Sequence, residues 1–121
     1  ELPSITAGED TPVHALLRSA SRPTAIVVSD DILALTLERI CTETGLSIPA
    51  DLSILSFNNS LFARLTSPQL TSIDINSCQL GIEAAAQMIS HIENPGLPAT
   101  KILVPHQLIE RDSCARPASH E

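Results

Sequence analysis

Residues 24–31 (TAIVVSDD) and 52–60 (LSILSFNNS) decide the fold of this chain. Each stretch is a short apolar run that ends abruptly in small polar, acidic or amide residues. A helical pattern over 31–44 separates the two runs, and strands that alternate with helices form a mainly parallel sheet. We therefore predict an α/β fold with a mainly parallel sheet that is flanked by helices on both faces.

The other elements follow from similar patterns along the 121 residues. We expect a helix over 31–44 that is capped by Ser29 or Asp30 and ended by Gly45. Apolar residues at 25–28 show no alternation, which indicates a strand buried on both sides. The remaining expected elements are a strand near 4–7, a helix at about 11–19, strands at 24–28, 52–57 and 70–75, a helical turn at 61–65, a helix from its N-cap Asn76 to about Glu93, and strands at about 100–104 and 107–110.

Polar residues follow two strands of the expected sheet at the point where each strand ends. In open parallel sheets, ligands bind in the crevice beyond the carboxyl ends of the strands. Asp30 and Asn58 offer acceptor oxygens and amide donors that suit a polyhydroxylated ligand. The alternative is that both segments only turn a strand into a loop and cap the helix that follows.

Motifs between and after these strands resemble a known family. The run 45–59 (GLSIPADLSILSFNN) and the run 66–73 (TSPQLTSI) follow a helix in the order found in the effector-binding domain of the LacI/GalR bacterial transcription repressors. The resemblance extends from about 23 to 113. The segment 56–59 (SFNN) is most similar to the maltose-operon repressor branch.

The resemblance implies an architecture and partners. Residues 1–121 correspond to the C-terminal lobe of a two-lobed, periplasmic-binding-protein-like domain, with 115–121 as a flexible tail. A sugar effector, maltose or a related glucoside, would bind between the lobes. The protein would be a cytoplasmic homodimer, and it would reach operator DNA only through an N-terminal domain outside this chain. The implied ligand-binding residues are Ser29, Asp30, Asn58 and Asn59.

The expected helix 31–44 carries more apolar surface than one sheet contact needs. Leu33, Leu37 and Ile40 form one stripe, and Ile32 and Leu35 lie outside it. This surplus indicates either a broad core contact or a subunit interface. The resemblance implies a dimer interface formed by Ile32, Leu35, Arg39, Leu65 and Thr66. Phe62 is a further candidate as an exposed aromatic residue, and the alternative is that it folds into the core.

The chain departs from the family pattern at both strand ends. The usual Asn-Asp is replaced by Asp30 and Asp31, and the usual Asp-Asp is replaced by Asn58 and Asn59. The exchange keeps one carboxylate and one amide for sugar hydroxyls. It also avoids two facing carboxylates, which would raise the pKa of one of them.

Composition and motifs argue against other classes of protein. Seven Lys and Arg stand against fourteen Asp and Glu, so we expect no direct DNA contact from this chain. No apolar run is long enough for a membrane span. We found no catalytic, cofactor or metal-ligand motif, and we expect no enzyme activity, cofactor or metal site. Two alternatives stay open: a sugar-binding component of a transporter with the same fold, and a phosphoacceptor receiver domain, which the paired Asp30 and Asp31 superficially resemble.

Overall fold

The computed structural model describes residues 11–117, and a four-stranded sheet lies at its centre. The strands lie side by side in chain order: β1 (Ala25–Val27), β2 (Ser53–Phe57), β3 (Thr71–Asp74) and β4 (Gln107–Ile109). β1, β2 and β3 run parallel, and β4 runs antiparallel to β3. The predicted α/β class with a mainly parallel sheet is confirmed.

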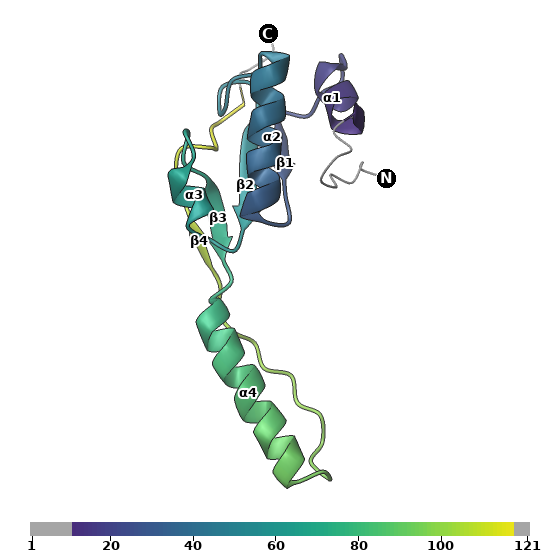
Figure 1. Ribbon diagram of the computed structural model, residues 1–121, viewed down its shortest axis with the longest axis vertical. Coiled ribbons are helices and arrows are strands. Elements are labelled where there is room, and N and C mark those ends of the chain that lie inside the picture. Colours follow the sequence, from purple (N-terminus) through teal and green to yellow (C-terminus); the bar gives the residue numbers. More distant parts are fainter. Residues whose placement is uncertain (1–10, 118–121) are drawn as a thin grey trace.

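Three of the four helices gather around this sheet. α2 (Asp31–Thr44) packs against β2, and α1 (Thr11–Arg18) and α3 (Phe62–Leu65) each pack beside α2 (Figure 1). The fourth helix, α4 (Ser77–Glu93), is the longest. In the part of the chain that is described, none of these helices is long and apolar enough to cross a bilayer. The buried core consists of Val13, Leu17, Val28, Ala34, Leu37, Ile40, Cys41, Leu52, Ile54, Ala63 and Leu70.

Both predicted caps of α2 are present. Asp30 is extended at φ −159°, and its carboxylate accepts a hydrogen bond from the backbone N–H of Leu33. Gly45 ends the helix at φ +76°, and its N–H donates to the carbonyl oxygens of Cys41 and Thr42. These local signals set the observed bounds of α2, which equal the predicted bounds.

Replacing Gly45 with alanine should lower the free energy of unfolding by about 1–2 kcal/mol, because a Cβ is disfavoured at positive φ. No atom lies within 4 Å of the added Cβ, so the loss would come from the backbone conformation and not from a clash. The matched control is Gly81→Ala inside α4, which should be neutral or stabilise by up to about 1 kcal/mol. Urea unfolding of both variants would measure the difference, and equal effects would contradict the argument.

One predicted strand does not form, one predicted cap lacks its side-chain hydrogen bond, and another predicted strand lies outside the described residues. Residues 100–104 do not form a strand, because they run alongside α4, away from any strand that could pair with them (Figure 1). Asn76 is the N-cap of α4, as predicted, and its carbonyl oxygen accepts from the backbone N–H of Leu80, but its backbone is left-handed and its side chain makes no capping hydrogen bond. Gln79, three residues later, instead donates to Glu83. The strand predicted near 4–7 falls in the part of the chain that the structure leaves undescribed.

Part of the apolar surface of the described chain is uncovered. Val27 in β1 is 62% exposed, so the prediction that this strand is buried on both sides is wrong for residues 11–117. Figure 1 shows α4 extending away from the sheet, and no residue of this fully described helix is buried. Ile92 is 71% exposed on it. An apolar pattern predicts that a segment will be covered, but it does not identify the covering element.

Candidate functional site

The carboxyl ends of β1 and β2 open on the same edge of the sheet. Ile26 pairs with Ile54 in parallel register, and Val28 continues the ladder by donating to the carbonyl oxygen of Leu55. Asp30 follows β1 and Asn58 follows β2, so both residues leave the sheet at this edge. The prediction that the two strand ends share an edge is confirmed.

The carboxylate of Asp30 is only partly used within the chain. Its Oδ1 accepts from the backbone N–H of Leu33 at 2.8 Å, which caps α2. Its Oδ2 accepts a long hydrogen bond of 3.4 Å from the exposed hydroxyl of Ser29. The cap therefore orients the carboxylate, and Oδ2 retains acceptor capacity for a ligand.

Asn58 presents its side chain to solvent. Its backbone N–H donates to the carbonyl oxygen of Ile73 at 2.9 Å, which fixes the residue at the edge of the sheet. Its φ is +92°, a conformation that few residues other than glycine adopt. Among the described residues, no partner hydrogen-bonds the Asn58 amide group. This amide can donate to and accept from a hydroxylated ligand.

Asn59 is turned inward, unlike its neighbour Asn58. Its Oδ1 accepts from Arg111 at 2.5 Å, and its Nδ2 donates to Asp74 at 2.9 Å. Both ends of the amide are thus engaged within the chain. The prediction that Asn59 contacts a ligand stays untested, but this geometry leaves the amide little capacity for one.

Asp31 forms the most buried polar cluster at this edge. The residue is 1% exposed, and Ser56 Oγ and Ser72 Oγ donate to its Oδ1 at 2.5 and 2.9 Å. The backbone N–H of Ser60 donates to its Oδ2 at 2.6 Å. Asp31 therefore ties the first turn of α2 to β2, to β3 and to the loop that leads into α3.

The hydrogen bonds of Asp31 control its ionisation. Burial raises the pKa of this carboxyl, but the hydrogen bonds from Ser56, Ser60 and Ser72 lower it by more. The resulting pKa lies below the usual value of 3.8. Asp31 is therefore a charged, fully engaged carboxylate at neutral pH, and its role in the chain is to organise the edge of the sheet.

The sequence prediction missed Asp74, Arg111 and the serines that contact Asp31. One signal for the serines was present: Ser56 and Ser72 lie inside segments predicted to be strands of the sheet, and buried hydroxyls need hydrogen-bond partners. Arg111 gave no comparable signal, because it lies 52 residues from its partner Asn59. Only the pairing of β3 with β4 brings it to this edge.

The predicted dimer residues come from two adjacent helices, α2 and α3. Ile32 is 60% exposed and Leu65 is 69% exposed, while Leu35 and Thr66 are half-buried. Two further apolar side chains of this region, Leu61 and Phe62, are also exposed. We call the group Ile32, Leu35, Leu61, Phe62 and Leu65 the α2–α3 face. Its role as an interface remains a prediction.

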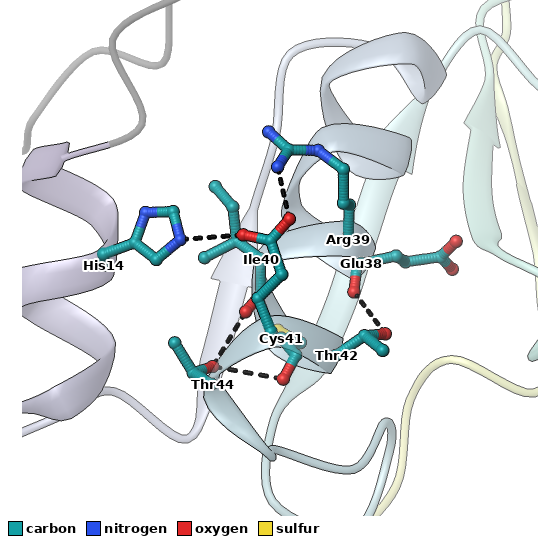
Figure 2. Close-up of polar contacts among 8 residues, drawn as sticks. His14, Glu38, Arg39, Ile40, Cys41, Thr42 and Thr44 are labelled. Atoms are coloured by element: carbon teal, nitrogen blue, oxygen red, sulfur yellow. Dashed lines mark hydrogen bonds and ion pairs between the residues drawn. The ribbon is translucent and has the colours of Figure 1, made fainter.

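Arg39, the remaining interface candidate, belongs to an ion cluster on α2. His14 Nε2 and Arg39 Nη1 lie 3.0 and 2.6 Å from the carboxylate oxygens of Glu43. The dashed lines from His14 and Arg39 in Figure 2 mark these two contacts. This cluster joins α1 to α2. Glu38 projects away from it (Figure 2), and one of its carboxylate oxygens is buried with no hydrogen-bond partner among residues 11–117. Burial raises the pKa of Glu38 to about 7, so this carboxyl partly carries a proton at neutral pH.

Comparison with known proteins assigns the chain to a family. Residues 3–114 match the family model of the periplasmic binding protein-like domain. The HTH-type transcriptional repressor PurR of Pectobacterium carotovorum is 35% identical over 103 residues. That match covers 85% of this chain but only 30% of the repressor. The chain therefore spans about a third of the length of the curated relatives that it matches.

Solved structures give the same result. One crystal structure is that of a putative transcriptional regulator LacI from Bacillus cereus subsp. cytotoxis. It superposes on this chain with a TM-score of 0.82 at 37% sequence identity, and the match covers 88% of this chain and 38% of the regulator. A LacI family regulator from Enterococcus faecalis, solved with bound ribose, has a TM-score of 0.76 at 34% sequence identity. That match covers 87% of this chain and 39% of the regulator. The chain belongs to the periplasmic binding protein-like domain family, in the form found in the effector-binding domains of LacI/GalR regulators.

Proposed function

We propose that this chain is the effector-sensing and dimerisation part of a bacterial transcriptional repressor that responds to a sugar. The observation that carries the proposal is the pair formed by the Asp30 carboxylate and the Asn58 amide, which open on one edge of the sheet. In open α/β sheets, ligands bind beyond the carboxyl ends of the strands, and a few placed polar groups fix their orientation. The relatives named above are transcriptional regulators and not enzymes.

The proposed ligand is maltose or a related glucoside. A carboxylate beside an amide suits adjacent sugar hydroxyls, which both donate and accept hydrogen bonds. The regulator from Enterococcus faecalis was solved with ribose, so a test must compare a pentose with a glucoside. The transporter alternative receives no support from the relatives described above, whose names are those of regulators.

We further propose that the chain is one lobe of a two-lobed domain. The exposed apolar side of β1 and the projecting helix α4 would then pack against parts of the protein outside this sequence. Both surfaces are too apolar to face water alone, since large exposed apolar patches mark contact sites. Sugar bound between the lobes would favour one lobe arrangement, and that arrangement would change operator binding through the homodimer.

The remaining parts of the proposal concern DNA and location. The net charge of −7 does not suit phosphate contacts, so we assign operator binding to a separate N-terminal domain of the complete repressor. A transcriptional repressor acts in the bacterial cytoplasm, where the thiols of Cys41, Cys78 and Cys114 would stay reduced. Of these, Cys41 is buried, and burial raises its pKa to about 11.

Substitution of Asp30 with serine in the complete repressor should weaken sugar binding by about 1.5–3 kcal/mol, the range for hydrogen bonds to a charged group. Serine is chosen because it still caps α2, whereas alanine would also remove the cap. Asn58→Gly should cost about 0.5–1.5 kcal/mol, because glycine keeps the positive φ and removes only the amide. Isothermal titration with maltose and with ribose would measure both losses.

A second measurement is the release of the complete repressor from operator DNA when maltose or ribose is added. The matched control is Asp112→Asn, which removes an exposed carboxylate away from the strand ends. A repressor that binds neither maltose nor ribose would refute the choice of ligand. Unchanged affinity in both Asp30→Ser and Asn58→Gly would refute the location of the site.

A further inference from the structure

Three asparagines carry the left-handed backbone at the proposed ligand edge. Asn58, Asn59 and Asn76 have φ values of +92°, +45° and +55°, and they are the residues other than glycine with positive φ in 11–117. Such conformations cost energy and persist only where surrounding contacts enforce them. The first two residues leave β2 and the third leaves β3, so both strand exits need an external constraint.

One carboxylate supplies a constraint to both exits. Asp74 Oδ2 accepts from Asn59 Nδ2 at 2.9 Å, and Asp74 Oδ1 accepts from the backbone N–H of Asn76 at 2.8 Å. The Asn59 hydrogen bond is the main cause of the lowered pKa of Asp74, and the Asn76 hydrogen bond adds to it. Asp74 thus stays charged at neutral pH and joins two segments that lie 17 residues apart in the chain.

The amide at position 59 is matched to its two neighbours. Arg111 Nη2 donates to its Oδ1, and Asp74 accepts from its Nδ2. The backbone N–H of Asn59 also donates to Ser72 Oγ, which itself donates to Asp31. An aspartate at position 59 would keep the contact with Arg111 but would turn a carboxylate oxygen towards Asp74. The departure from Asp-Asp at this strand end therefore has a local reason: the neighbour at position 74 is acidic.

We propose that Asn59 and Asp74 are positioning residues that form a clasp between the exits of β2 and β3, and that this clasp holds the adjacent Asn58 in the orientation that meets the ligand. The role given to Asn58 rests on the proposed function. Neither Asn59 nor Asp74 needs to touch the ligand, because Asn59 uses both ends of its amide inside the chain.

The test exchanges the two groups in the complete repressor. Asn59→Asp places two carboxylates together, whereas the double variant Asn59→Asp with Asp74→Asn restores one donor facing one acceptor. Gln69→Glu is the control, because it adds the same charge at an exposed position. The readouts are titration with maltose and ribose, and hydrogen exchange of the amides in 58–60 and 75–77.

Asn59→Asp should weaken sugar binding roughly tenfold or more, the equivalent of one lost charge-assisted hydrogen bond. The double variant should recover most of the affinity. The defect of Asn59→Asp should shrink as the pH falls below about 5, because protonation of one carboxyl removes the repulsion between the pair. Hydrogen exchange in both segments should accelerate in the single variant and slow again in the double variant.

Unchanged sugar affinity in Asn59→Asp would overturn the proposal, as would a loss that the double variant does not recover. If the unaltered repressor binds neither sugar, the proposed function fails and hydrogen exchange decides the clasp by itself. Exchange that is equal in the unaltered protein, the single variant and the double variant would then show that no clasp exists. Faster hydrogen exchange in the single variant, with a return towards the unaltered rate in the double variant, would support the clasp.

Discussion

Substitution of Asp31 with alanine should lower the free energy of unfolding by about 3–5 kcal/mol, because three neutral donors lose a charged acceptor and each such hydrogen bond contributes about 1.5–3 kcal/mol. Ser56 and Ser72 would lose their acceptor in a region from which water is excluded. The backbone N–H of Ser60 would lose the contact that holds the loop before α3. Urea unfolding monitored by circular dichroism would measure the loss, and a change below about 1 kcal/mol would contradict this role.

The same carboxylate should contribute to acid sensitivity. The pKa of Asp31 in the folded protein lies below 3.8, its value in an unfolded chain. Its stabilising contribution is therefore complete above that value, and it is lost as the pH falls through the folded pKa. Asp31→Asn should lose stability at pH 7 but should show a smaller further loss between about pH 4 and pH 2. Urea titrations at several pH values would test this sign.

Leu65→Asp should shift the complete repressor from dimer towards monomer by roughly a hundredfold or more in dissociation constant. In a two-fold dimer each substitution acts twice, and burial of one leucine contributes about 1.5–3 kcal/mol. Leu65 is 69% exposed in the described chain, so the substitution should leave the fold intact. Sedimentation velocity across a concentration series would measure the shift, and operator binding should weaken with it.

Ile32→Asp is a second variant of the α2–α3 face and should give the same result, because Ile32 is 60% exposed. Leu35→Asp is a poorer test, since Leu35 is half-buried and its replacement also disturbs the packing of α2. Ala50→Asp, at an exposed turn outside this face, is the matched control. A fully dimeric Leu65→Asp variant with normal thermal stability would place the interface elsewhere.

The elements that depend on local chemistry could be predicted from the sequence. Asp30 and Gly45 bound α2 because a side-chain acceptor and a residue free to adopt positive φ act on their own backbone neighbourhood. The apolar runs around Ile26 and Ile54 predicted adjacent parallel strands, since strands separated by a helix pair in this way. The shared edge of Asp30 and Asn58 follows from that topology alone.

Which of two chemically identical neighbours faces outward depends on contacts made across the fold. Asp30 keeps an available oxygen and Asp31 is buried, while Asn58 is exposed and Asn59 is engaged, although each pair is adjacent in the sequence. The difference arises from partners such as Arg111, whose approach depends on the pairing of distant strands.

The departure of α4 from the sheet also could not be predicted. The amphipathic pattern of this helix indicates an apolar face that needs a partner. Burial of apolar surface is non-directional, so the pattern does not identify that partner. A hydrogen-bonded cap acts over a few residues and can be recognised from the sequence, whereas a packing partner is chosen by the whole fold.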